Sequence, residues 1–248
     1  MSALALGRRA ASLLVLEPGH LQAGSTARVL DHEFPTDDDI AQLLTSLPMG
    51  PTAWVVDDAW APSLLLRDLA DLPEGSEARE AFFRWRFTQQ LSLEGPHVVQ
   101  ALEVASGQWL LAGLPEAKRD AWLAMAQNLG RPMVSLLPRW LWLYNRLAPS
   151  LDGPGLLLSL SPSGSPSGDP RYTGTLVAWG TSLHLVRQWT EPMALETWRR
   201  DCIAPTLAFL HRESRTPQEL LVWGCDAFLE PSIPVRILSR ELPVAEVR

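Results

Sequence analysis

Two adjacent carboxylates are the clearest candidates for chemistry in this chain. Asp57 and Asp58 follow an apolar run in WVVDDAW, and carboxylates at the end of a strand can act as general acid and base. Aspartate also starts turns, because its side chain accepts a hydrogen bond from the backbone that follows it. No second element of matching chemistry accompanies the pair, so we interpret these residues as the start of a turn.

A run of three acids, Asp37 to Asp39, offers the oxygen ligands that divalent cations prefer. The same residues are typical of a helix start. Thr36 precedes them, and Asp39 lies three residues further on, which is the spacing of a short capping box. Acidic side chains are also stabilised at the positive end of a helix. We therefore expect a capped helix here rather than a metal site.

The sequence lacks the common motifs for a nucleophile or a metal. The segment SPSGSPSG is similar to a G-x-S-x-G nucleophile elbow, but Pro166 stands where the serine is needed. The histidines show neither HExxH spacing nor a pairing with cysteine, and they are His20, His32, His97, His184 and His211. Lys118 is the single lysine, and its context AKRDAW predicts an exposed helix face. This position disfavours P-loop or Schiff-base chemistry.

Composition and charge limit the possible function further. The chain has 248 residues, of which 46% are hydrophobic and 20% charged, as in a globular protein with a sizeable core. The net charge of -7 disfavours nucleic-acid binding. Cys202 and Cys225 lack metal-ligand spacing, and we interpret them as buried free thiols. No apolar run reaches the roughly 20 residues of a membrane span, and Arg8 and Arg9 do not fit a signal peptide. We expect a soluble cytoplasmic chain.

Eleven tryptophans are present. Core packing is the simple interpretation, because each ring buries a large apolar area. Aromatic side chains also anchor protein interfaces, so a groove for a partner peptide is the alternative interpretation for some of them.

Apolar periodicity predicts strands and helices in the first part of the chain. In EAREAFFRWRFTQQL, Phe83, Phe87 and Leu91 recur every four residues and predict one apolar helix face. In PEAKRDAWLAMAQNLG, Pro115 and Gly130 mark the start and the end of a helix. A short helix is expected in RWLWLYNRLA. The expected strands or extended segments are residues 4–6, 12–16, 27–34, 52–60, 63–73, 97–104, 107–115 and 131–138.

A break at SLDGPG, residues 150–155, is where we place the boundary between two lobes. The second lobe is expected to contain the buried strand GLLLSLS and a hairpin, GTLVAWG and SLHLVRQW, around Gly180. A helix over ALETWRRDCIAPTLAFLHRES should be kinked near Pro205, and ELLVWG and VRILSREL should be closing strands. Strands followed by helices, twice over, predict a two-lobed α/β protein.

The order of these elements resembles that of the actin-like type IV pilus assembly protein PilM and of the cytoplasmic domain of the type II secretion protein GspL. The resemblance covers most of the chain and is carried by LALGRRAASLLVLEPGHLQ, WVVDDAWAPSLLLRDLADLP, EAREAFFRWRFTQQL, WLLAGLPEAKRDAWLAMAQNLGRPMVSLLPRWLWL, GTLVAWGTSLHLVRQW and ELLVWGCDAF. It implies a two-lobed actin-like (ribonuclease H-like) fold with lobes at residues 1–150 and 151–248. It also implies a small subdomain inserted in the first lobe, at about residues 52–137.

The resemblance also implies three loops that would hold a nucleotide. An active site of this type needs carboxylates to hold magnesium-bound water, and glycine turns that let backbone amides approach the phosphates. In the first loop, the family's acid falls on Ala5, while Gly7 remains and Arg8 follows it. Arg8 and its neighbour Arg9 could attract a phosphate or simply solvate a turn.

The other two loops depart from the family as well. In LLLSLSPSG, Ser159 stands where the acid belongs and Ser161 where a glycine belongs. In the third loop, Gly224 is followed by Cys225 instead of a second glycine. Alanine and serine cannot balance the charge of magnesium, so we expect a degenerate nucleotide site, no catalytic residue and no cofactor.

The resemblance implies a scaffold rather than an enzyme. In PilM-like proteins the inserted subdomain helps to form a groove for the short cytoplasmic tail of a membrane partner, and the candidates for its walls are Phe83, Trp85, Phe87 and Trp109. GspL-like proteins contact the secretion ATPase and continue into a membrane helix. We therefore expect a platform protein at the cytoplasmic face of the inner membrane, joining an assembly ATPase to membrane subunits of a pilus or secretion machine.

Two alternatives remain. A divergent actin-like ATPase or kinase would bind Mg-ATP, with Asp57, Asp58 or Asp169 replacing the missing carboxylates. An α/β binding module unrelated to actin would lack two similar lobes.

Overall fold

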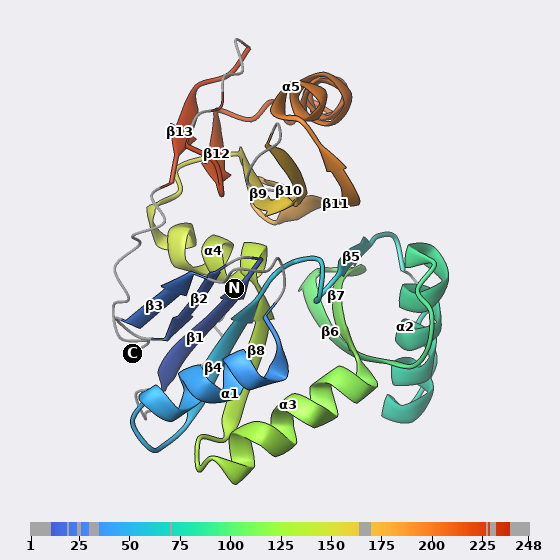
Figure 1. Ribbon diagram of the computed structural model, residues 1–248. Coiled ribbons are helices and arrows are strands. Elements are labelled where there is room, and N and C mark those ends of the chain that lie inside the picture. The colour runs from blue at the N-terminus through green and yellow to red at the C-terminus, as the bar shows by residue number, and fades with distance from the viewer. Residues whose placement is uncertain are drawn as a thin grey trace. The chain divides into compact units, whose positions relative to one another are not determined.

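The computed structural model describes residues 11–18, 20–23, 26–29, 35–69, 71–163, 170–226, 228 and 232–238. The chain divides into two compact units (Figure 1). Of the described residues, those up to Pro138 form the first unit, and those from Arg139 onward form the second. Among the described residues, no helix is long and apolar enough to cross a membrane.

The first unit is built on a five-stranded mixed sheet with the order β3-β2-β1-β4-β8. In that order the strands are Thr26–Val29, His20–Ala23, Ser12–Glu17, Thr52–Val56 and Met133–Pro138. The pairs β1–β2 and β2–β3 are antiparallel, whereas β1–β4 and β4–β8 are parallel. The two central strands β1 and β4 are buried along almost their whole length, as their uninterrupted apolar runs predict.

Two helices, α1 (Asp37–Ser46) and α3 (Glu116–Asn128), belong to the same unit. The predicted capping box of α1 is confirmed, since Asp39 N donates to the Thr36 hydroxyl and the Asp39 carboxylate accepts from Thr36 N. Helix α3 begins after Pro115 and ends before Gly130, as predicted. Its Trp122 is buried in the core and donates from Nε1 to Asp37 at 3.3 Å. The first residue of α1, Asp37, therefore also holds a core tryptophan of α3 in place.

The chain between β4 and β8 forms a second, three-stranded antiparallel sheet with the order β5-β7-β6. Its strands are Ser63–Leu66, Gln108–Pro115 and His97–Ala105, and helix α2 spans Ser76–Leu91. The apolar face of α2 packs on the sheet through Phe83 and Phe87. This separate sheet begins only at β5, because β4 and β8 belong to the five-stranded sheet. An inserted subdomain at about residues 52–137 stays a prediction, and the strands at the two ends of that range belong to the five-stranded sheet.

The second unit repeats the topology of the first (Figure 1). Its five-stranded sheet has the order β11-β10-β9-β12-β13, made of Leu183–Met193, Arg171–Trp179, Gly155–Ser163, Glu219–Trp223 and Val235–Ile237. The first three strands pair antiparallel, and β9–β12 and β12–β13 pair parallel. Two units with one strand order confirm the two-lobed α/β fold.

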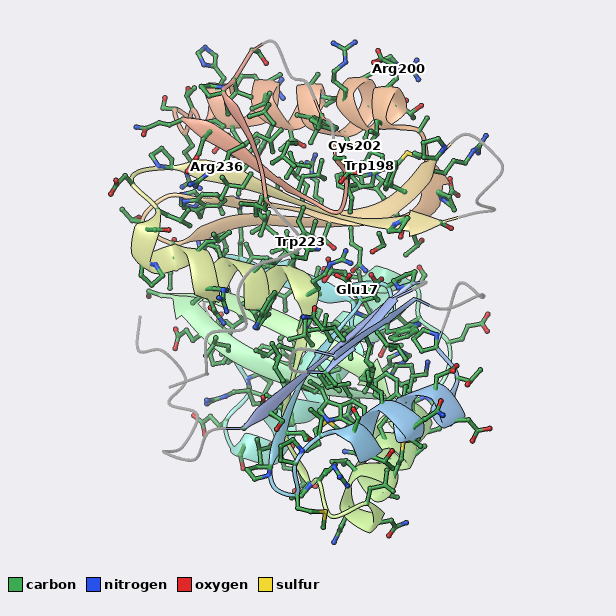
Figure 2. All side chains as sticks on the ribbon, turned by 60° about the vertical axis from the view of Figure 1, so that its left-hand side comes forward. Glu17, Trp198, Arg200, Cys202, Trp223 and Arg236 are labelled. Carbon is green, nitrogen blue, oxygen red and sulfur yellow. The ribbon has the colours of Figure 1, made fainter. Side chains whose placement is uncertain are left out.

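A continuous helical segment covers one face of this sheet. It consists of α5 (Leu195–Thr197), a π-helical stretch (Trp198–Ile203) and α6 (Ala204–Arg212). The π-helical stretch ends at Ile203, two residues before Pro205, which cannot donate a backbone hydrogen bond, so the predicted irregularity near this proline is confirmed. Trp198 and Cys202 point from this segment into the core above the sheet (Figure 2).

The division between the units lies earlier than the sequence break at residues 150–155. It falls between Pro138 and Arg139, so helix α4 (Arg139–Leu147) belongs to the second unit. The reason is packing that periodicity does not reveal. Arg139 donates hydrogen bonds to serines of β9, and Tyr144 contacts Trp179 of β10 with ring centroids 5.9 Å apart.

Candidate functional site

Among the described strands, β1 and β2 form the first hairpin of the sheet. Ala5, Gly7, Arg8 and Arg9 are outside the described residues, so their predicted roles are untested. The described hairpin pairs Glu17 with His20 across a turn that contains Pro18. The side chain before this turn is therefore Glu17, a buried carboxylate at the end of β1 (Figure 2). The strand β2, which spans only the four residues HLQA, was not predicted from periodicity.

Asp57 and Asp58 follow β4 directly and are both buried. Asp57 N donates to Leu16 O of β1 at 2.9 Å, and the Asp57 carboxylate accepts from Ala59 N at 2.9 Å. The predicted turn is thus confirmed. Because β1 and β4 are parallel neighbours, Glu17 and both aspartates lie at the same edge of the sheet. Nevertheless, within the described ranges no three His, Cys, Asp or Glu side chains are grouped so that they could hold a metal ion.

In the second unit, an arginine of α4 contacts the strand β9, where a nucleotide loop was expected. Arg139 is only 1% exposed, and Ser159 and Ser161 are fully buried beside it. Its Nε donates to Ser159 Oγ at 3.0 Å and its Nη2 to Ser161 Oγ at 2.7 Å. The two hydroxyls are therefore held by a cation of the same unit. Arg139 was missed by the sequence analysis, since an arginine inside RWLWL carries no signal of its burial.

Gly224 follows β12, as predicted, and has the left-handed φ of +95°. A Cβ atom here would lie more than 1 Å inside the 3.0 Å that real Cβ atoms keep from Leu160 O, a backbone atom of β9. Close packing of two neighbouring strands thus requires this glycine. The neighbouring thiol of Cys225 is buried, as is that of Cys202. Burial raises the pKa of Cys202 from 9.0 to about 11, so both cysteines match the predicted inert thiols.

The four aromatic residues expected to wall a groove have different environments. Phe83 and Phe87 are buried in the core between α2 and its sheet, and Trp109 is partly buried with its ring 4.8 Å from that of Phe83. Trp85 is 54% exposed. Of the four, Trp85 alone presents a large part of its ring to solvent.

Lys118 is not on a freely exposed face. Its Nζ lies 4.5 Å from the ring centroid of Trp60 and 5.1 Å from that of Trp122. Burial lowers the pKa of the amine, and nearby Asp37 partly opposes this shift. Cation–π contact of this kind stabilises a lysine that has lost part of its hydration. The geometry indicates a structural role between α3 and the turn after β4.

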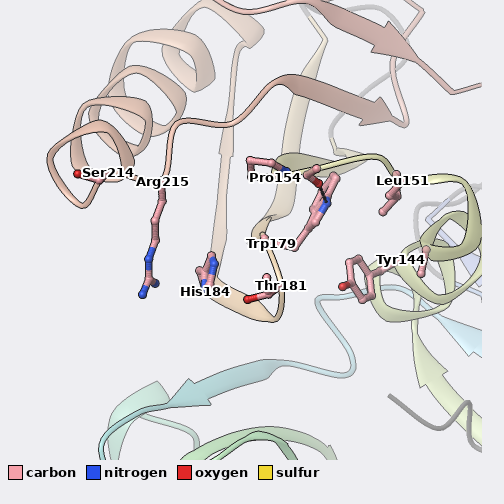
Figure 3. A pocket seen from close by; sticks show the side chains of 11 residues that line it. Tyr144, Leu151, Pro154, Trp179, Thr181, His184, Ser214 and Arg215 are labelled. Atoms are coloured by element: carbon pink, nitrogen blue, oxygen red, sulfur yellow. Dashed lines mark hydrogen bonds between the residues drawn. The ribbon is translucent and has the colours of Figure 1, made fainter.

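A pocket of about 500 Å³ lies in the second unit (Figure 3). Tyr144, Trp179 and His184 are buried side chains of its wall, and Thr181, Ser214 and Arg215 lie nearer to solvent. Pro154, the residue directly before β9, lines the pocket. Ser161 lies six residues further along that strand than Gly155, or roughly 20 Å, so this pocket is not the expected nucleotide loop.

The overall fold is shared with two solved structures. One is described as a PilM-PilN type IV pilus biogenesis complex, with 16% sequence identity, a TM-score of 0.59 and coverage of 94% of this chain and 89% of that chain. The other is the cytoplasmic domain of EpsL, an inner membrane component of the type II secretion system of Vibrio cholerae, with 10% identity, a TM-score of 0.52 and coverage of 94% and 91%. No protein-family model and no curated protein matches the chain. The resemblance expected from the sequence is thus confirmed at the level of the fold.

Proposed function

We propose that this chain is a non-catalytic scaffold of a type IV pilus or type II secretion platform at the cytoplasmic face of the inner membrane. In this role it binds the cytoplasmic segment of a membrane-anchored subunit, the assembly ATPase, or both. Its support is the actin-like fold that it shares with a PilM-PilN complex and with the EpsL cytoplasmic domain, together with the chemistry of the strand ends.

The observation that carries the non-catalytic part is the contact of Arg139 with Ser159 and Ser161. A site that holds Mg-ATP needs negative or neutral oxygen ligands facing the metal. Here the end of β9 presents two hydroxyls, and both already accept hydrogen bonds from a buried guanidinium. A magnesium ion placed there would compete with this guanidinium for the hydroxyl oxygens.

A partner surface is best supported around Trp85 on α2. The Arg86 guanidinium lies 5.6 Å from the centroid of the Trp85 ring and 5.8 Å from that of Phe82, so the three side chains form one aromatic and basic surface. Exposed tryptophan and arginine are the residues that most often dominate binding energy at interfaces. We assign this surface, rather than the buried Phe83 and Phe87, to the membrane subunit's segment.

The test is calorimetric titration with synthetic peptides that cover the cytoplasmic segments of candidate pilus and secretion subunits. We expect one peptide to bind in the micromolar range and Trp85→Ala to weaken it at least about tenfold. Leu123→Ala is the matched control, because Leu123 is also an exposed apolar residue but lies on α3. Absence of binding by every peptide, or equal losses in both variants, would contradict the proposal.

A divergent ATPase or kinase is the second candidate, and one observation favours it. Glu17, Asp57 and Asp58 are buried carboxylates at the same edge of the first sheet. If they hold a magnesium nucleotide, Mg-ATP should raise the melting temperature, because a ligand that binds only the native state stabilises it.

The two candidates are separated by titration with Mg-ATP. The scaffold predicts no heat at millimolar Mg-ATP and no hydrolysis. The enzyme predicts binding and slow hydrolysis that Asp57→Asn abolishes, whereas Asp38→Asn, at an exposed position in the first turn of α1, leaves both unchanged.

A further inference from the structure

The pocket of the second unit has a rigid, mostly apolar wall. Trp179 closes one side, and its indole is fixed by a hydrogen bond from Nε1 to Gly153 O at 3.1 Å (Figure 3). Tyr144 packs against it at 60°. Leu151 and Pro154 extend this surface. The volume of about 500 Å³ is within the range of pockets that bind small organic ligands.

One wall of the pocket carries a cation whose position is set by the end of α6. Ser214, with a φ of +55°, donates its N–H to His211 O, and Arg215 donates its N–H to Leu210 O at 2.9 Å. These two bonds form a Schellman motif, which fixes the backbone where the helix ends. Among the described residues, no side chain accepts a hydrogen bond from the Arg215 guanidinium. The backbone of Arg215 is thus fixed at the rim of the pocket.

The charge of the lining is opposite to that of the whole chain. The protein has 28 acidic against 21 basic residues, yet none of the eleven described residues that line the pocket carries a carboxylate. Arg215 and His184 supply basic groups, and Thr181 and Ser214 supply hydroxyl donors. The carboxyl end of α6 contributes a partial negative charge nearby, so attraction of an anion depends on Arg215.

We propose that this pocket binds an organic anion in which a carboxylate is joined to a flat apolar group. The flat group would pack against Trp179 and Tyr144, since aromatic rings favour offset or edge contacts with other rings. The carboxylate would accept paired hydrogen bonds from Arg215, whose planar guanidinium matches its geometry. The proposal concerns a part of the sheet remote from Ser159 and Ser161, and it holds whether or not the chain binds a pilus subunit.

The probe is 3-phenylpropionate, observed by saturation-transfer NMR, with 3-phenylpropanamide as the uncharged isostere and acetate as the carboxylate without a ring. We expect the acid to bind the full chain, and the amide and acetate each to bind at least about tenfold more weakly. Arg215→Gln should weaken the acid at least tenfold. Arg212→Gln should change it less than twofold, because Arg212 is exposed at the end of α6, three residues before Arg215, and does not line the pocket.

The result that overturns the proposal is absence of saturation transfer to the acid, equal binding of acid and amide, or equal losses in the two arginine variants. Circular dichroism melting of both variants shows whether Arg215→Gln still folds. If it does not, Arg215→Lys takes its place, and retained charge without the planar fork should still weaken the acid severalfold. An acetylated tripeptide that ends in phenylalanine then identifies the source. Tighter binding than 3-phenylpropionate indicates a peptide carboxyl terminus, and weaker binding indicates a free small acid.

Discussion

Replacing Gly224 by alanine tests whether this glycine serves strand packing or a phosphate loop. Two costs follow from its geometry. An L-residue at a φ of +95° loses about 1 kcal/mol or more relative to glycine. The added Cβ would also overlap Leu160 O by more than 1 Å, and the obstacle is backbone of β9, which cannot rotate away. Overpacking of this kind costs typically 1–3 kcal/mol. The two costs together predict a loss of roughly 2–5 kcal/mol of unfolding free energy.

The assay is urea unfolding monitored by the labelling of the Cys202 thiol. The protein carries Cys225→Ala, so that the single remaining buried thiol reports on the unfolding of the second unit. Gly153→Ala is the matched control, because Gly153 has a φ of +80° and its added Cβ meets only the side chain of Gln218, at 2.7 Å from Oε1. That exposed side chain can move aside, so the control should lose only about 1 kcal/mol.

Equal losses in Gly224→Ala and Gly153→Ala would refute the packing argument, because backbone strain alone would then explain both. A Gly224→Ala protein of normal stability that has lost Mg-ATP binding would point instead to a phosphate loop.

Three further predictions concern ionisable side chains that are buried or partly buried. Arg131→Met should lose about 3 kcal/mol in urea unfolding, since its guanidinium donates to Leu47 O, Leu129 O and Thr45 O at helix ends, whereas the exposed Arg84→Met should lose little. Burial holds the pKa of Lys118 in the folded protein below 10.5, so the unfolded chain binds more protons than the folded chain in the pH window below 10.5. The unfolding free energy of the wild type relative to Lys118→Met should therefore rise with pH in this window. A difference that does not change with pH would contradict this. The Cys202 pKa of about 11 lies above 9.0, so stability relative to Cys202→Ala should fall between pH 9 and 11, and a rise would contradict the burial argument.

Local patterns in the sequence determined most of the elements. The capping residues Thr36 and Asp39, the punctuation of α3 by Pro115 and Gly130, and the irregularity before Pro205 are all decided by short-range hydrogen bonding and steric limits. The buried β1 and β4 follow from uninterrupted apolar runs, and β9 follows from the apolar residues 156–158 and Leu160. For these features, residues within a few positions of one another are sufficient to predict the local structure, and the structure agrees with these predictions.

Tertiary structure alone decided which polar residues meet. Pairing of β1 with β2 places Glu17 directly before a turn, because a short strand is defined by its partner more than by its own residues. The burial of Arg139 against Ser159 and Ser161 joins residues about 20 positions apart, and the lining of the pocket by Tyr144, Trp179 and Arg215 joins three different elements. Contacts between residues so far apart in the sequence depend on strand register and on helix packing, and hydrophobic periodicity predicts neither.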